Sequence, residues 1–146
     1  MALVFDNQGQ YGKALKYYER ALDGREKPLG VCHPDTLTTV HCMAFLFSNQ
    51  GQYDKALEYY ERALAGYEKS LGVDHPNTLA TVHNMAFVFD NQGQYDKALK
   101  YSERAFLGWC TRLGGSHPHT QNAHRALVSL YKKTGRPLAT WICPPL

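Results

Sequence analysis

The sequence predicts an all-α protein, an α-solenoid of antiparallel helical hairpins with about seven helices. Two short strings carry this prediction, because each occurs three times and both keep the same spacing of 42 residues. The first reads Asn-Gln-Gly-Gln-Tyr and begins at residues 7, 49 and 91; the second reads His-Pro-x-Thr and begins at residues 33, 75 and 117. A regular period between about 20 and 50 residues is typical of solenoids and repeat arrays.

Composition excludes several classes of protein. The chain has 146 residues, and its net charge of +3 is too small and too scattered to indicate a nucleic-acid partner. No apolar run approaches the roughly 20 residues that span a bilayer, and the first residues lack the basic segment of a signal peptide. We therefore expect a cytoplasmic protein with no membrane partner. Its four cysteines form no CxxC pair and are expected to be reduced thiols.

The chain opens in the middle of a repeat. Residues 1–7 align with residues 43–49 and 85–91, so the first half of a helix is absent and the sequence looks like part of a longer array. The incomplete unit leaves the apolar face of the following helix partly uncovered near Tyr17, Tyr18 and Leu22. This predicts self-association through the truncated N-terminal end.

The longer helix of each unit is predicted at residues 11–29, 53–71 and 95–113. Its apolar residues recur in steps of three and four, which places them on one face of a helix. In the second copy these residues are Tyr53, Ala56, Leu57, Tyr60, Ala63, Leu64, Tyr67 and Leu71. Gly72 follows the last of them, as a residue that ends a helix does.

The shorter helix of each unit is predicted at residues 34–49 and 76–91, with the same apolar spacing. Pro34 and Pro76 suit the first helical position, where a missing N–H has no cost. In the second copy Asp74 or His75 can cap the free amides. Each helix ends in the Asn-Gln-Gly-Gln hinge, where Gly51 can adopt the positive φ that a turn demands. So short a connection makes the two helices antiparallel.

These helices define the domain organisation. Full repeats are predicted at 34–71 and 76–113, followed by a more polar capping helix at 120–134 that ends at Gly135. The terminal unit of a solenoid requires a polar outer face, because no further repeat covers it. The array therefore covers residues 1–135. In the tail, residues 136–146, Leu138, Trp141 and Ile142 are expected to fold back over the capping helix.

The repeat matches a known signature. Val40-x₂-Met43-Ala44-x₂-Phe47, Ala56-x₃-Tyr60, Ala63 and Pro76 follow the pattern W-x₂-L-G-x₂-Y…A-x₃-F…A…P, so the chain resembles tetratricopeptide repeat (TPR) proteins. Its period exceeds the usual ~34 residues because the second helix is longer. This variant, with its Leu-Gly-x-x-His-Pro link, resembles the repeats of kinesin light chains, nephrocystin-like proteins and STAND-type (NLR-like) signalling ATPases.

The resemblance implies a right-handed superhelix whose concave groove is lined by the shorter helices. The implied peptide-binding residues are Thr38, His41, Cys42, Phe45, Ser48, Asn49, Ala80, His83, Asn84, Phe87, Asp90, Asn91, Asn122 and Arg125. Kinesin light chain repeats carry two adjacent asparagines where this chain has His41-Cys42 and His83-Asn84. Of the asparagines that contact cargo in that family, only Asn84 is present here.

Two features of the groove set are informative. Phe45 and Phe87 are apolar at positions that should face solvent, which usually marks a binding surface, unless they pack against the next helix. Asn49 and Asn91 could bond a peptide backbone or cap their helices. His41, His83 and Arg125 could meet an acidic side chain.

Catalytic chemistry is not indicated. His33, His75 and His117 recur one full unit apart and cannot converge on one metal ion, so we expect them to cap helices or pack in the links. The chain has no complete metal-ligand set, GxSxG elbow, phosphate loop or HExxH motif. We therefore predict a non-enzymatic protein with no metal and no cofactor.

The sequence leaves two functions open. The first is a protein–protein interaction scaffold that binds a peptide segment in the concave groove. The alternative is a structural, oligomerisation or autoinhibitory sensor segment of a larger STAND-type signalling ATPase.

Overall fold

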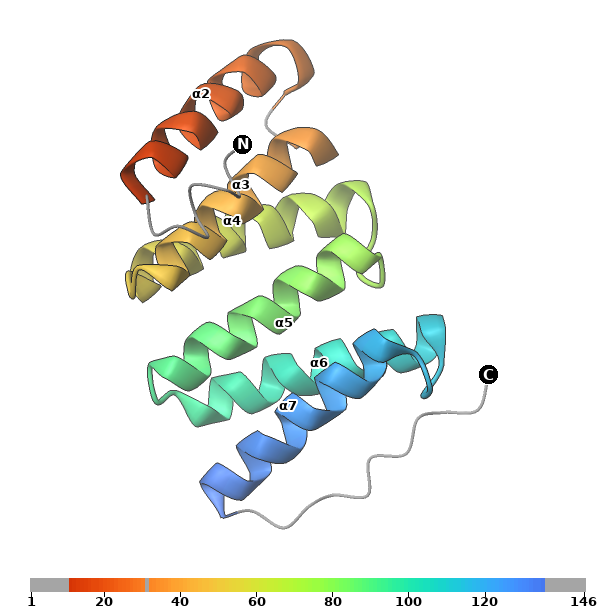
Figure 1. Cartoon of the computed structure of the whole chain (residues 1–146). Coiled ribbons are helices and arrows are strands. Elements are labelled where there is room, and N and C mark those ends of the chain that lie inside the picture. Colours follow the sequence, from red (N-terminus) through yellow and green to blue (C-terminus); the bar gives the residue numbers. More distant parts are fainter. Residues whose placement is uncertain (1–10, 31, 136–146) are drawn as a thin grey trace. The chain divides into compact units, whose positions relative to one another are not determined.

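A computed structural model of the chain describes residues 11–30 and 32–135. Within these residues the fold is all-α, as predicted, and contains six helices and no strand (Figure 1). The helices are α2 (Tyr11–Leu29), α3 (Pro34–Asn49), α4 (Tyr53–Ser70), α5 (Pro76–Asn91), α6 (Tyr95–Leu113) and α7 (Pro118–Thr134). The incomplete first helix and the tail at 136–146 lie outside the described residues.

The helices begin and end close to the residues that the repeat predicts. Four of the six helices begin and end at the residues predicted from the repeat, and α4 ends one residue early, at Ser70. The last helix, α7, begins at Pro118 rather than Thr120. This difference has a physical reason, because His117 caps the helix and Pro118 occupies its first turn, as the equivalent residues do in α3 and α5.

The Asn-Gln-Gly-Gln hinge forms a Schellman turn in both complete repeats. At the end of α3 the N–H of Gln52 donates to the carbonyl of Phe47 at 2.9 Å, and Gly51 adopts a φ of +77°. The equivalent bond from Gln94 to Phe89 at the end of α5 is also 2.9 Å. This pattern satisfies helix-end carbonyls and requires a left-handed residue at the glycine. The predicted structural role of Gly51 is confirmed.

The recurrent histidines cap the shorter helices. The Nδ1 atoms of His33, His75 and His117 accept hydrogen bonds from the backbone N–H two residues later, at 3.1, 3.1 and 3.2 Å. Each side chain therefore satisfies one of the amides that a helix leaves unpaired at its N-terminus. The predicted capping role is confirmed.

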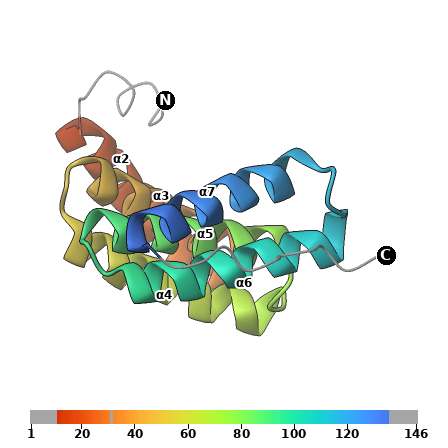
Figure 2. The same ribbon diagram turned by 90° about the horizontal axis from the view of Figure 1, so that it is seen from below.

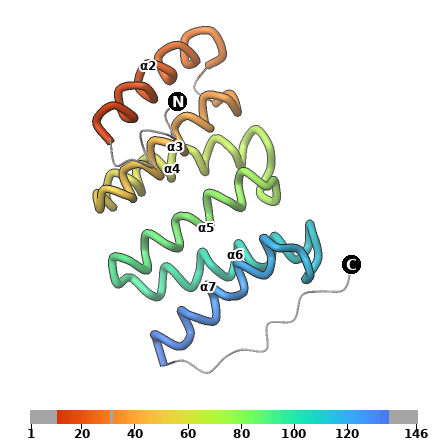
Figure 3. Tube along the Cα trace, viewed as in Figure 1, coloured from red at the N-terminus to blue at the C-terminus, as the bar shows by residue number. Residues whose placement is uncertain are grey.

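The chain divides into two compact units between Val73 and Asp74, and each is described separately. Unit 1 contains α2, α3 and α4; unit 2 contains α5, α6 and α7. Within each unit the chain reverses direction at every link, so α5 and α7 run the same way and α6 runs opposite to both (Figure 3). In the view of Figure 2, α6 and α7 of unit 2 lie in separate layers.

Large apolar side chains fill the space between the helices of each unit. In unit 1, Leu37, Val40, Ala63 and Tyr67 form a buried cluster, against which Leu22, Tyr59 and Leu71 pack. In unit 2 the corresponding core is formed by Leu79, Val82, Met85, Ala98, Ala105, Ala123 and Leu127. Burying a side chain of this size contributes about 1.5–3 kcal/mol, so packing rather than helix propensity stabilises the hairpins.

Two further results concern the cysteines and the membrane. Cys32 is a free thiol, but the expectation of reduced cysteines is wrong for Cys110, which is fully buried and disulfide-bonded. None of the described helices is long and apolar enough to cross a membrane.

Candidate peptide-binding groove

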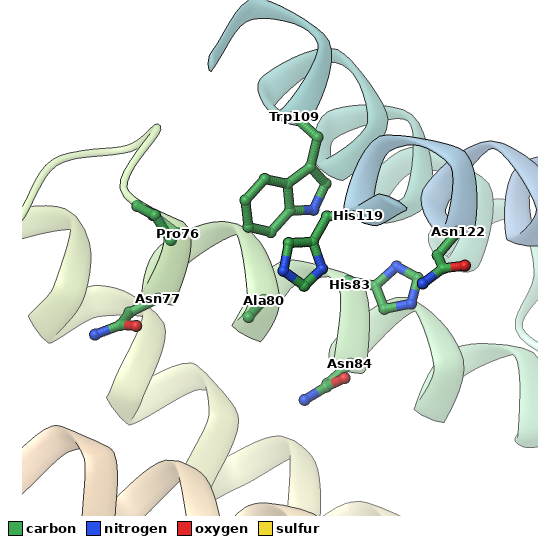
Figure 4. A pocket seen from close by; sticks show the side chains of 8 residues that line it. All are labelled: Pro76, Asn77, Ala80, His83, Asn84, Trp109, His119 and Asn122. Carbon is green, nitrogen blue, oxygen red and sulfur yellow. The ribbon is translucent and has the colours of Figure 1, made fainter. Parts of the chain in front are cut away.

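Unit 2 contains a hollow of about 390 Å³ between the two shorter helices α5 and α7 (Figure 4). Four residues predicted for the groove line it: Ala80, His83 and Asn84 from α5, and Asn122 from α7. The structure therefore brings together side chains that are about 40 residues apart in the sequence. Figure 4 shows the side-chain amides of Asn84 and Asn122 at the same hollow as the imidazole of His83.

A second hollow of about 220 Å³ lies beside the first and shares His83 with it. It is lined by His83, Ala86, Phe87, Asp90, Ser102, Ala126, Ser129 and Leu130. Phe87 and Asp90 belong to the predicted set, so six predicted residues of unit 2 border one or other hollow. Both hollows are apolar surfaces with a few polar groups, which is the composition of most ligand sites.

Phe45 and Phe87 are exposed, as the sequence predicts. The exposed fraction is 43% for Phe45 on α3 and 59% for Phe87 on α5. A phenylalanine that leaves half of its surface in water gives up part of the burial energy that its neighbours in the core obtain. Such rings are available to a ligand.

Burial makes two of the histidines neutral. The ring of His41 lies edge-on to Tyr60, with ring centres 5.3 Å apart, and burial lowers the pKa of His41 to about 4. Burial, and secondarily the nearby His119, also lowers the pKa of His83. At neutral pH both rings are therefore hydrogen-bonding groups rather than cations. Arg125, the third residue predicted to meet an acidic side chain, borders a separate hollow on α7 with His124, Val128, Ser129 and Lys132.

The other predicted residues have diverse surroundings. The hydroxyl of Thr38 is 3.0 Å from that of Tyr67, and Asp90 accepts hydrogen bonds from Lys133 Nζ at 2.9 and 3.0 Å. Cys42 is half-buried, while Ser48 is only 8% exposed and offers little surface to a ligand.

The asparagines at the hinge are exposed but do not cap their helices. Asn49 and Asn91 are the last residues of α3 and α5, and both are exposed. The cap positions are occupied by Gln50 and Gln92, whose backbone N–H groups bond carbonyls of the last turn. The side chains of Gln50 and Gln52 bond each other at 3.0 Å, which ties the hinge to itself.

Four residues that line the first hollow lie outside the predicted set: Pro76 and Asn77 of α5, Trp109 of α6 and His119 of α7. Trp109 on α6 stacks on His119 of α7, with ring centres 4.9 Å apart, and both line the 390 Å³ space. Trp109 holds the repeat position of Arg25 and Tyr67, which carries a different residue in each of the three copies.

Comparisons with known proteins agree with this architecture. Two tetratricopeptide repeat family models match residues 1–35 and 35–106. A kinesin light chain-like protein of Podosopora anserina, with nearly identical TPR-like repeats, superposes with a TM-score of 0.84 at 27% identity over 92% of this chain. The protein BtubC (BKLC) from P. vanneervenii gives a TM-score of 0.83 at 21% identity over 92% of this chain, which shows likeness of fold alone.

The chain therefore belongs to the tetratricopeptide repeat family, whose helical hairpins form α-solenoids that act as protein–protein interaction scaffolds. Within that family its repeats are of the kinesin light chain type. The chain spans 64% of the length of the Podosopora structure and 54% of that of BtubC. No curated protein sequence matches this chain.

Proposed function

We propose that this chain is a non-catalytic scaffold that binds a segment of a partner protein in the groove of unit 2, between α5 and α7. In unit 1, α3 carries the equivalent residues His41, Cys42 and Phe45 and is proposed to take part in the same way. The observation that carries the proposal is the exposed ring of Phe87 beside two adjacent hollows that share His83.

The chemistry of the groove suits a peptide. Each hollow is comparable to or smaller than a drug-sized site, so together they fit separate side chains better than one large ligand. Asn84 and Asn122 carry both donors and acceptors, which an extended peptide backbone needs along its length. The neutral His83 between the hollows can also donate or accept.

A peptide-array screen followed by titration of the best peptide tests the proposal. Phe87→Ala should weaken binding by about fivefold or more, because an aromatic ring at the centre of an interface contributes more than ~1 kcal/mol. Leu107→Ala is the matched control, since Leu107 is also an exposed apolar residue but lies on α6 and borders neither hollow. Equal losses in the two variants, or no loss in either, would refute the groove assignment.

Phe45→Ala in the same titration reports whether α3 contributes to peptide binding.

A further experiment addresses the alternative occupant of the groove, a segment of a longer chain that would act as an intramolecular brake. Peptides from any flanking sequence should compete with the array peptide if that alternative is right, and should leave its binding unchanged if the occupant is a separate protein.

A further inference from the structure

One core position differs between the repeats in a way that changes the shape of the groove. The position is tyrosine in the first two copies, Tyr18 and Tyr60, and both side chains are buried. In the third copy it is Ser102. In unit 1 the ring of Tyr60 lies edge-on to His41 at 5.3 Å. In unit 2 the equivalent histidine, His83, faces a position that has no ring.

The 220 Å³ hollow lies where that ring is missing. His83 and Ser102, the equivalents of His41 and Tyr60, both line it. Ala86 and Leu130 are buried members of its wall, whereas Phe87 and Ser129 are exposed and form its rim. An engineered apolar cavity of about 150 Å³ is known to bind benzene, so a space of this size accommodates one aromatic ring.

The hollow also holds a polar atom without a partner. Ser102 is 1% exposed, and its Oγ makes no hydrogen bond within the described part of the chain. Buried hydroxyls are nearly always bonded, so this one calls for a ligand atom or water. A phenol hydroxyl both donates and accepts, and it suits such a group.

The charge at the wall of the hollow restricts the kind of ligand further. Asp90 lines the hollow, and its carboxylate pairs with Lys133. A carboxylate at the wall disfavours an anionic ligand such as a phosphorylated ring, and it accepts a hydrogen bond from a neutral hydroxyl.

We propose that the hollow at Ser102 is a subsite for a phenol ring, presented as the tyrosine side chain of the segment bound in the groove. The ring would take the place beside His83 that Tyr60 occupies beside His41. The proposal rests on the proposed function, because the rim residue Phe87 also belongs to the groove and places the hollow within reach of a docked peptide.

The first test uses p-cresol alone, which is the side chain of tyrosine without a peptide. Titration into the isotope-labelled protein should shift the backbone amide signals of Ala86, Ser102 and Leu130 and leave those at Ala80 unchanged. Ser102→Tyr, which restores the residue of the other repeats, should abolish these shifts. Ser102→Ala should still bind the ring but lose the preference for p-cresol over toluene, about threefold to tenfold for one hydrogen bond.

The second test uses the array peptide. Replacing its tyrosine with alanine should weaken binding to the wild-type protein but not to Ser102→Tyr, and tyrosine phosphorylation should weaken it in the wild type. Ala80→Phe, which obstructs only the other hollow, is the control and should leave p-cresol binding unchanged.

The outcomes separate the two proposals. If p-cresol gives no shifts at the hollow, or the same shifts in Ser102→Tyr, the subsite is wrong even where Phe87→Ala still weakens the peptide. If p-cresol binds but the peptide shows no dependence on tyrosine, the hollow takes a free phenol and the side-chain assignment is overturned. If Phe87→Ala has no effect while p-cresol binds, the groove proposal fails instead.

Discussion

Gly66 allows α3 and α4 to pack closely, and its replacement by alanine should reveal the cost of filling that space. A Cβ atom at Gly66 would lie 2.5 and 2.6 Å from the two methyl carbons of Leu37 and 3.1 Å from its Cγ. Leu37 is 1% exposed and belongs to the core cluster of unit 1. The substitution must therefore displace the side chain of Leu37 from the core cluster, which overpacks the hairpin.

Two opposing effects set the magnitude. Alanine in place of a mid-helix glycine stabilises by about 1 kcal/mol, whereas an extra methyl group in a packed core costs about 1–3 kcal/mol. Gly24 provides the matched control, because it holds the same repeat position in α2 and a Cβ there would meet nothing within 4 Å. Gly24→Ala should therefore stabilise by about 1 kcal/mol, and Gly66→Ala should fall below it by about 1–3 kcal/mol.

Urea unfolding followed by far-ultraviolet circular dichroism measures both variants. A Leu37→Ala background gives an internal check, since removing the methyl groups should abolish the penalty of Gly66→Ala. If Gly66→Ala stabilises the protein as much as Gly24→Ala, the close approach of the two helices is not what the glycine serves.

The remaining predictions concern pH, capping and association. The pKa of His41 is about 4 in the folded state and 6.5 in the unfolded state, so the unfolded state binds more protons. The free energy of unfolding should therefore be highest above pH 7 and be lower by ~2 kcal/mol at pH 5. Urea midpoints across this range should show a flatter profile for His41→Gln, and an unchanged slope would contradict the assignment. His75→Ala should lower stability by ~1 kcal/mol in thermal melts, while His75→Asn keeps most of the cap; equal losses would argue against capping. Tyr17 is exposed on α2, so light scattering should show self-association that Tyr17→Glu reduces, and a wild-type monomer at high concentration would end that idea.

The helices could be predicted from the sequence because their ends depend on local chemistry. Gly51 must adopt a positive φ, Pro76 must begin a helix, and His75 can reach an amide two residues away; none of these depends on distant parts of the chain. The apolar spacing then assigns the core. α7 begins at Pro118 rather than at the predicted Thr120, because the proline rule that holds for Pro34 and Pro76 also holds for this more polar helix.

The groove could be predicted only in part, because its shape depends on where a side chain is small as much as on where one is large. The exposed Phe87 follows from its place on α5, but the hollow beside it arises from Ser102 on another helix. Comparing the copies of the repeat position by position would have identified Ser102, and also Trp109 and the recurrent Gly24, Gly66 and Gly108. The charge of His41 and His83 could not be predicted from the sequence, since burial rather than residue type sets the protonation of their rings.

The Schellman turn at the hinge has a consequence for how the chain acquires its structure. The bonds of Gln50, Gly51 and Gln52 all return to the last turn of α3, so the bend needs no contact with any other hairpin. Pairings between sequence neighbours close short loops at small entropic cost, and they form early. Each hairpin can thus nucleate independently while the chain is still being synthesised, and opening can spread one hairpin at a time. Amide hydrogen exchange should then be graded from unit to unit rather than uniform.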